Sequence, residues 1–184
     1  MISQKKQIII EKSADLFHQY GYNNTGLNLI LKELNIPKGS FYNYFESKEA
    51  LAVEVVSWHI DQTRSLFEQS TVNKRNTEGI KDFFKIFFDR ILAMDFNNGC
   101  PIGNLITELS DLSEPVRLEL LKWIEYLEDE IGTILKESEI EDPEAMASFI
   151  VAAFEGVILK AKVEKNDKAL KNFNQYILNN LLKN

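Results

Sequence analysis

Apolar residues recur every three or four positions along most of this chain, which is the spacing of one face of an α-helix. The alternation with a period of two that marks a half-buried strand is not the dominant pattern. Residues that interrupt helices are scarce, since the 184 residues include only 4 Pro and 8 Gly. The sequence therefore predicts an all-α protein.

Turn and cap residues divide this pattern into successive helices. Gly21 is expected to stop the first helix, Pro37 to lie at the start of the third, and Ser47 to be the N-cap of the fourth. The expected helices are Ser3–Tyr20, Leu27–Leu34, Lys38–Phe45, Lys48–Gln69, Glu78–Asp95, Pro101–Asp111, Glu114–Glu137, Pro143–Glu164 and Lys168–Leu182.

Two short helices joined by a tight turn and supported by a longer first helix have the layout of a helix-turn-helix. In the third helix, Phe41 and Phe45 are spaced to bury together, whereas Gly39, Ser40 and Asn43 fall on a different face. We name these last three residues the reading face. Its glycine permits close approach of the backbone to DNA, and its serine and asparagine can hydrogen-bond to base edges in a major groove. Spacing alone is equally compatible with a plain helical hairpin with exposed tyrosines.

Several polar side chains around this face are candidate contacts to the DNA backbone. Lys38 can reach a guanine or a phosphate. Hydroxyl and ammonium groups near helix ends are typical phosphate ligands, and those expected here belong to Thr25, Tyr42, Tyr44 and Lys48.

The distribution of charge is consistent with DNA binding at the N-terminal end. The whole chain has a formal net charge of −7, but its first 50 residues carry six lysines against five acids. The acidic balance therefore lies in the remainder of the chain, away from the proposed reading face.

The amino-acid sequence of this segment resembles the signature of a known family. The run TGLNLILKELNIPKGSFYNYFESKEAL, residues 25–51, is similar to the signature of the tetracycline-repressor-like (TetR/AcrR) regulators, above all in KGSFYNYF and SKEAL. The resemblance implies an Ω-shaped homodimer that binds a palindromic double-stranded DNA operator and is released by a small-molecule effector. It also implies a DNA-binding domain over residues 1–47 and a divergent ligand-binding and dimerisation domain over residues 48–184.

The C-terminal part contains two further patterns. Aromatic residues occupy more than one face of residues 83–88, which suggests an apolar cavity or a packed core. The candidate cavity and sensor residues are Trp58, His59, Phe84, Phe87, Phe88, Cys100, Trp123 and Tyr126. Small and apolar residues follow one another at helical spacing in the last two helices, as in a helix–helix contact between subunits or in an internal core. The candidate dimer contacts are Ser148, Phe149, Ala152, Gly156, Phe173, Ile177 and Leu181.

The single cysteine, Cys100, excludes an internal disulfide and fits a cytoplasmic protein. It precedes Pro101 near the expected start of a helix, where the helix dipole can lower the pKa of a thiol. The stretch GCPIGNL also looks like one found in a subset of these regulators, some of which sense electrophiles or oxidants. A thiol sensor and a packed, inert thiol are both compatible with the sequence.

Other classes of function are less well supported. His18 and His59 are the only imidazoles, and we find no phosphate-binding glycine loop, metal-ligand spacing or nucleophile triad. We therefore expect no enzyme, no cofactor and no metal. No segment has the length of a membrane span, so no membrane partner is expected. A helical adaptor that binds another protein through its tyrosine-rich end is the more distant alternative.

Overall fold

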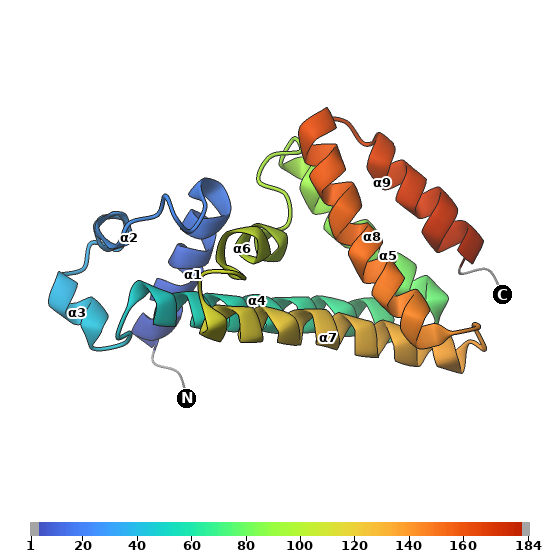
Figure 1. The fold of residues 1–184 in the computed structure, drawn as a ribbon, viewed down its shortest axis with the longest axis horizontal. Helices are drawn as coiled ribbons and strands as arrows, with labels where there is room; N and C mark the ends of the chain where they lie inside the picture. Colours follow the sequence, from blue (N-terminus) through green and yellow to red (C-terminus); the bar gives the residue numbers. More distant parts are fainter. Residues whose placement is uncertain (1–3, 182–184) are drawn as a thin grey trace. The chain divides into compact units, whose positions relative to one another are not determined.

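The computed structural model describes residues 4–181, in which every regular element is a helix. Its elements are α1 (Gln4–Tyr20), α2 (Leu27–Leu34), α3 (Lys38–Tyr42), α4 (Lys48–Thr71), α5 (Thr77–Ala93), α6 (Pro101–Leu109), α7 (Glu114–Glu137), α8 (Pro143–Glu164), α9 (Lys168–Asn172) and the π-helix η1 (Phe173–Leu181) (Figure 1). The described residues contain no strand, which confirms the predicted all-α class.

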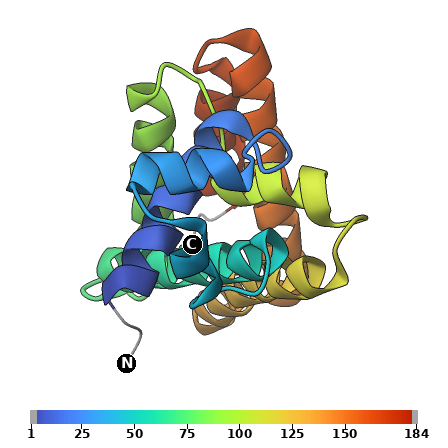
Figure 2. The same ribbon diagram turned by 90° about the vertical axis from the view of Figure 1, so that its left-hand side faces the viewer.

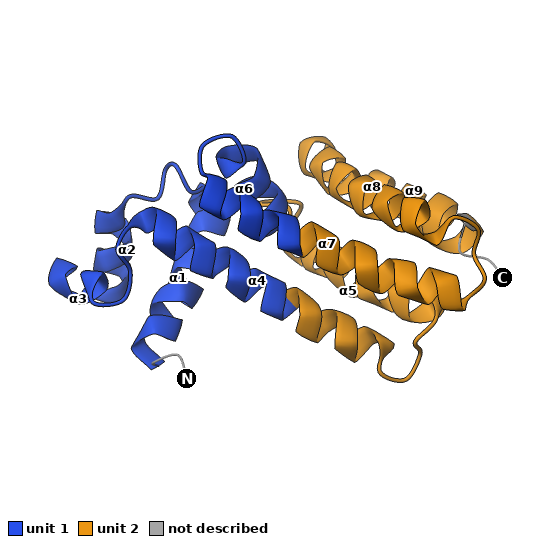
Figure 3. Cartoon of the chain, turned by 60° about the horizontal axis from the view of Figure 1, so that its bottom comes forward, with its two compact units in different colours: residues 1–62, 101–122 blue, residues 63–100, 123–184 orange. Residues whose placement is uncertain are grey.

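The chain folds into two compact units. Unit 1 consists of residues 1–62 and 101–122, and unit 2 consists of residues 63–100 and 123–184 (Figure 3). Both α4 and α7 contribute residues to each unit. This division differs from the sequence-based boundary after residue 47, because the segment 101–122 returns to the N-terminal helices.

Unit 1 contains the three N-terminal helices, which are at the front of Figure 2. The buried side of α1 includes Ile9, Ile10, Leu16 and Phe17. Ile30 of α2 is also fully buried. An ion pair of 3.3 Å between Lys12 of α1 and Glu33 of α2 joins the two helices at the surface. The short second helix is therefore held by apolar packing on the first.

Unit 2 has an aromatic core. The rings of Phe84, Phe88, Phe154 and Phe173 lie with their centroids 5.0–6.4 Å apart in successive contacts, and all four side chains are buried. Phe83 and Phe67 also contact each other edge to face, with their ring centroids 5.2 Å apart. Such contacts between rings from α4, α5, α8 and η1 stabilise the unit beyond the burial of their area alone.

The observed bounds of three helices match the bounds predicted from the sequence, and those of other helices differ. α2, α7 and α8 have the predicted bounds. α3 ends at Tyr42 rather than near Phe45, because the Phe41 carbonyl accepts hydrogen bonds from the amides of both Tyr44 and Phe45 in a closing turn. The expected ends at Ser3 and Leu182 lie outside the described residues.

The last predicted helix changes its register. It is α-helical to Asn172 and continues as a π-helix from Phe173 to Leu181. Phe173 and Leu178, which are five residues apart, are both buried. A turn widened to the i→i+5 pattern places residues at this spacing on one side, where both can join the core.

Candidate nucleic-acid interface

The turn between α2 and α3 is closed by its backbone. Asn35 adopts a left-handed conformation with φ 51°, and its amide donates to the Lys32 carbonyl at 3.1 Å. The Ile36 amide donates to the Leu31 carbonyl at 3.1 Å. Pro37 follows in an extended conformation and begins α3 as its N-cap. A left-handed C-cap followed by proline ends one helix and starts the next within three residues.

The short α3 has two chemically different sides. Phe41 and Phe45 are buried, and their rings are 5.4 Å apart. Lys38, Gly39, Tyr42 and Asn43 are exposed, while Ser40 and Tyr44 are partly exposed. No atom outside the local backbone lies within 4 Å of a Cβ built on Gly39. The reading face predicted from sequence is thus accessible, and the two phenylalanines anchor it.

A groove of about 390 Å³ opens beside this face. Ser40, Asn43 and Tyr44 line it together with Lys5 of α1 and several apolar residues. The remaining lining residues are Ile8, Ile9, Leu34, Ile36 and Pro37. The surface next to the polar side chains is therefore concave and carries apolar groups of the kind that contact thymine methyls.

Thr25 does not have the exposed hydroxyl that the sequence suggested. Its side chain is fully buried, and its hydroxyl donates to the Gly21 carbonyl at 2.7 Å, with the Leu16 carbonyl at 3.3 Å. In this structure the Thr25 hydroxyl fastens the turn to the end of α1 and is not presented to a phosphate.

Lys48 lies at the start of α4 and is bonded to the turn between α1 and α2. Its Nζ donates to the Tyr22 carbonyl at 2.9 Å and to the Thr25 carbonyl at 3.1 Å, and it lies 3.8 Å from the centre of the Tyr22 ring. Burial lowers the pKa of Lys48, and the Glu108 carboxylate opposes this by raising it. An ammonium has three donors, and two of them are taken by these carbonyls.

Ser47 caps α4 as predicted, because its hydroxyl oxygen accepts the Ala50 amide at 2.9 Å. This cap fixes the entry of α4, and with it the position of Lys48 one residue later.

The sequence did not identify Tyr22 or Glu108 as part of this region. Glu108, on α6, accepts the backbone amides of Tyr22 at 3.1 Å and Asn23 at 2.8 Å. The left-handed Gly21 (φ 83°) predicts a turn here, but no local pattern links that turn to a residue 86 positions away.

The aromatic residues predicted to line a cavity belong to both units. Trp58 and His59 are in unit 1, with their rings 4.8 Å apart. In unit 2, Phe84 and Phe88 are buried in the aromatic core, whereas Phe87 is partly exposed and its ring lies 4.9 Å from that of Phe154. Phe88 also lines a surface groove of about 380 Å³ between α5 and the C-terminal helices.

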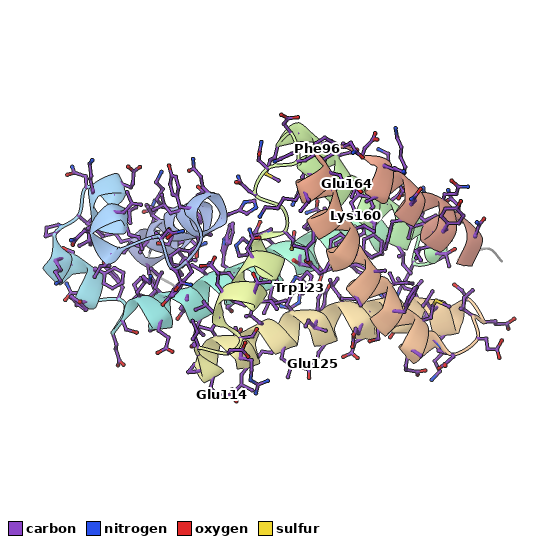
Figure 4. All side chains as sticks on the ribbon, turned by 45° about the horizontal axis from the view of Figure 1, so that its top comes forward. Phe96, Glu114, Trp123, Glu125, Lys160 and Glu164 are labelled. Atoms are coloured by element: carbon purple, nitrogen blue, oxygen red, sulfur yellow. The ribbon has the colours of Figure 1, made fainter. Side chains whose placement is uncertain are left out.

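Trp123 and Tyr126, one turn apart on α7, have polar partners in unit 2. The Trp123 indole N–H donates to the Thr63 hydroxyl at 3.0 Å, and its ring is buried (Figure 4). Tyr126 packs beneath the Arg64 guanidinium, 5.2 Å from its ring centre. Burial, assisted by Glu130 and Glu68, raises the pKa of Tyr126 to about 12.

Cys100 is 3% exposed and forms a hydrogen bond with the Glu155 side chain of α8. Glu155 is largely buried, and this burial raises the pKa of its carboxyl group, while the bond to Cys100 lowers it. The other carboxyl oxygen, Oε1, is buried without a hydrogen-bond partner. The thiol is therefore packed next to an acidic group rather than exposed.

One side of α8 is exposed and largely apolar. Ser148, Phe149, Ala152 and Gly156 of the predicted interface lie on it, and Phe149 is 54% exposed. Leu159 and Val163 extend the same stripe, which is bordered by the ion pair of Lys160 and Glu164 at 2.6 Å (Figure 4).

The other predicted dimer contacts, which lie in the last helix, differ from one another in burial. Phe173 is buried against Phe84 and Phe88, so it belongs to the core of unit 2 and not to an exposed surface. Ile177 is partly exposed. The side chain of Leu181 lies outside the described residues.

No group of three or more potential metal-ligating side chains occurs in the described part of the chain. Within residues 4–181, no helix is both long enough and apolar enough to span a membrane.

Comparison with known proteins places these features in a family. Residues 9–55 match the model of bacterial regulatory proteins of the tetR family, and residues 77–176 match the LmrA/YxaF-like transcriptional regulator C-terminal domain. The HTH-type transcriptional repressor DhaR of Mycobacterium sp. (strain GP1) is 32% identical over 188 residues, covering 96% of this chain and 92% of DhaR.

Solved structures have the same fold. The crystal structure of regulatory protein TetR from Rhodobacter sphaeroides is 25% identical, with a TM-score of 0.86 over 96% of this chain and 98% of that chain. The reduced form of E. coli NemR is 26% identical, with a TM-score of 0.81 over 97% and 95% of the two chains. The chain therefore belongs to the TetR family and is a DNA-binding transcriptional regulator.

Proposed function

We propose that this regulator binds a palindromic DNA operator as a homodimer, with α3 of each subunit in a major groove. Ser40 and Asn43 contact base edges, and Gly39 lets the backbone come close. Lys38, Tyr42, Tyr44 and Lys48 contact the phosphates. The single observation that carries this assignment is the accessible polar side of α3 directly opposite the buried Phe41 and Phe45.

The exposed stripe of α8 supports the dimer. Large apolar side chains such as Phe149 and Val163 flank small residues, and nothing lies within 4 Å of a Cβ built on Gly156. A second α8 can approach closely at such a position. Two-fold pairing places the two α3 helices on half-sites about 34 to 36 Å apart or multiples of that distance.

A small molecule bound by the C-terminal part releases the protein from DNA and relieves repression. Such a ligand must bind the DNA-free arrangement more tightly than the DNA-bound one, because equal affinity for both leaves the equilibrium unchanged. A ligand of this kind requires apolar surface, to which the partly exposed Phe87 of α5 and Tyr126 of α7 contribute. As a regulator of transcription, the protein acts in the bacterial cytoplasm.

Fluorescence anisotropy with labelled duplexes tests the proposal. One duplex comes from the region upstream of the protein's own coding sequence, and a scrambled duplex of equal length is the control. We expect tighter binding to the first, one dimer per duplex, and a steep loss of affinity with added salt. Equal affinity for both duplexes, or affinity independent of salt, would contradict operator binding.

A second candidate function is sensing of electrophiles or oxidants by Cys100 on the same scaffold. The observation that favours it is the position of Cys100, directly before the first residue of α6, the helix whose Glu108 is bonded to the turn before α2. Modification of a thiol that is 3% exposed requires the surrounding packing to open, which would displace the start of α6.

The variant Cys100→Ser separates the two candidates. A thiol sensor predicts that N-ethylmaleimide or hydrogen peroxide releases the wild type from its duplex and leaves the variant bound. Release of both proteins, or of neither, would contradict sensing through Cys100 and leave the small-molecule mechanism in place.

A further inference from the structure

The carboxylate of Glu108, on α6, binds the backbone of the turn between α1 and α2. Glu108 uses one oxygen for each of two consecutive amides: Oε1 accepts from Tyr22 and Oε2 accepts from Asn23. Hydrogen bonds to an ionised carboxylate are stronger than those between neutral groups. The turn connects α1 to α2, and its carbonyls at Tyr22 and Thr25 accept the Lys48 ammonium.

The approach of Glu108 to this turn is close. A Cβ on Gly21 would lie 2.8 Å from Oε1, so a larger residue at that position would force the Glu108 carboxylate to shift. The left-handed φ of 83° imposes the same requirement independently. Gly21 thus suits the left-handed turn and leaves room for the Glu108 carboxylate beside it.

A further hydrogen bond joins the turn after α6 to the start of α4. Ser113, in the turn after α6, donates its hydroxyl to the Glu49 carboxylate in the first turn of α4 at 2.5 Å. Its oxygen also accepts the Val116 amide at 3.3 Å and caps α7. The segment from Glu108 to Ser113 is therefore bonded to both chain segments that flank α2 and α3.

We propose that Glu108 is a positioning residue for DNA binding, through which α6 holds the α1–α2 turn and Lys48 in the arrangement that meets the DNA backbone. This inference rests on the proposed function, since it assigns a route by which the C-terminal part acts on the same DNA contacts. A movement of α6 that withdraws the carboxylate frees both amides and removes the bonds between the turn and α6, while Lys48 and the turn's own hydrogen bonds remain.

The sign of the effect on affinity separates positioning from simple electrostatics. Glu108→Ala removes a negative charge close to the DNA-binding segment, and charge alone predicts tighter binding. A positioning role predicts weaker binding in spite of the more favourable charge. Asp111→Asn is the matched control, because Asp111 is exposed two residues after α6 and its loss changes the charge by the same amount.

The experiment combines amide exchange measured by NMR with the anisotropy assay on the same full-length variants. In Glu108→Ala we expect the Tyr22 and Asn23 amides to exchange about tenfold faster or more, and affinity for the duplex to fall. In Glu108→Gln only one acceptor oxygen is left, so one of the two amides stays protected. Asp111→Asn leaves both amides protected and affinity equal to or above that of the wild type.

Two results would overturn the inference: unchanged exchange at both amides in Glu108→Ala, or binding by that variant as tight as by Asp111→Asn. If Glu108→Ala fails to fold, as judged by circular dichroism, Glu108→Gln decides the same comparison. If the wild type itself shows no affinity for the duplex, the proposed function fails, and the exchange data still report whether Glu108 holds the turn.

Discussion

The Lys48 ammonium lies 3.8 Å from the centre of the Tyr22 ring and donates a hydrogen bond of 2.9 Å to the carbonyl oxygen of the same residue. A charged group expected to bind phosphate therefore also braces the turn before α2. These two roles can be measured separately, because only a phosphate contact contributes to the salt dependence of binding.

Replacing Lys48 by Ala is expected to weaken binding to every duplex and to flatten the slope of log affinity against log salt by about one unit. Anisotropy titrations between low and moderate salt measure both quantities. Tyr22→Leu, which removes the ring but retains the carbonyl acceptor, is expected to leave the slope unchanged. An unaltered slope in Lys48→Ala would limit this lysine to bracing the turn.

Asn43→Ala and Ser40→Ala are expected to change the preference at particular base pairs, with a loss of about 1 to 3 kcal/mol for each good contact removed. Competition with duplexes that carry single base-pair changes maps the affected positions. Tyr42→Phe, which removes a proposed phosphate ligand, should lower affinity for all of these duplexes alike. If the Asn43 and Ser40 variants also lose affinity uniformly, the assignment of the reading face is wrong.

Gly156→Arg is expected to raise the dimer dissociation constant by about tenfold or more, because an unpaired charge would be buried at the contact between two α8 helices. The open space around Gly156 allows the monomer to fold, so the helix content measured by circular dichroism should be unchanged. Sedimentation equilibrium measures the association. Ala93→Arg, at an exposed position on α5, is the control that should leave the dimer intact.

His59 is expected to make the free energy of unfolding depend on pH. Burial, with a smaller effect of His18, lowers its pKa from 6.5 to about 4 in the folded protein. Between about pH 6.5 and pH 4, His59 is therefore protonated in the unfolded chain but neutral in the folded protein. The free energy of unfolding consequently decreases as the pH falls through this range.

In His59→Gln the loss of stability between pH 7.5 and pH 5 should be smaller than in the wild type by roughly 1 to 2 kcal/mol. Urea denaturation followed by circular dichroism at both pH values measures this difference. Parallel pH profiles for the two proteins would show that His59 titrates normally.

Local patterns in the sequence were sufficient to predict much of the DNA-binding segment. The apolar spacing of α2 and the position of Pro37 gave the bounds of that helix and the start of the next. The separation of Phe41 and Phe45 from the polar residues of α3 also follows from helical periodicity, because residues four apart share a side of a helix wherever it packs.

The interactions that hold this segment depend on residues far apart in the chain. Thr25 was predicted to contact a phosphate, and its burial against the end of α1 follows from the path of the turn, which periodicity does not encode. Phe173 fits a seam between subunits as well as a core, and only the widened turn of η1 and the rings of α5 place it inside unit 2. The bonds from Glu108 to Tyr22 and Asn23 join positions more than 80 residues apart. The sequence by itself determined which residues could form helices and which sides of them are polar, since these properties depend on neighbours within a turn or two. The tertiary structure decided which polar groups remain available to DNA, because a buried donor or acceptor takes whatever partner the fold brings within hydrogen-bonding distance.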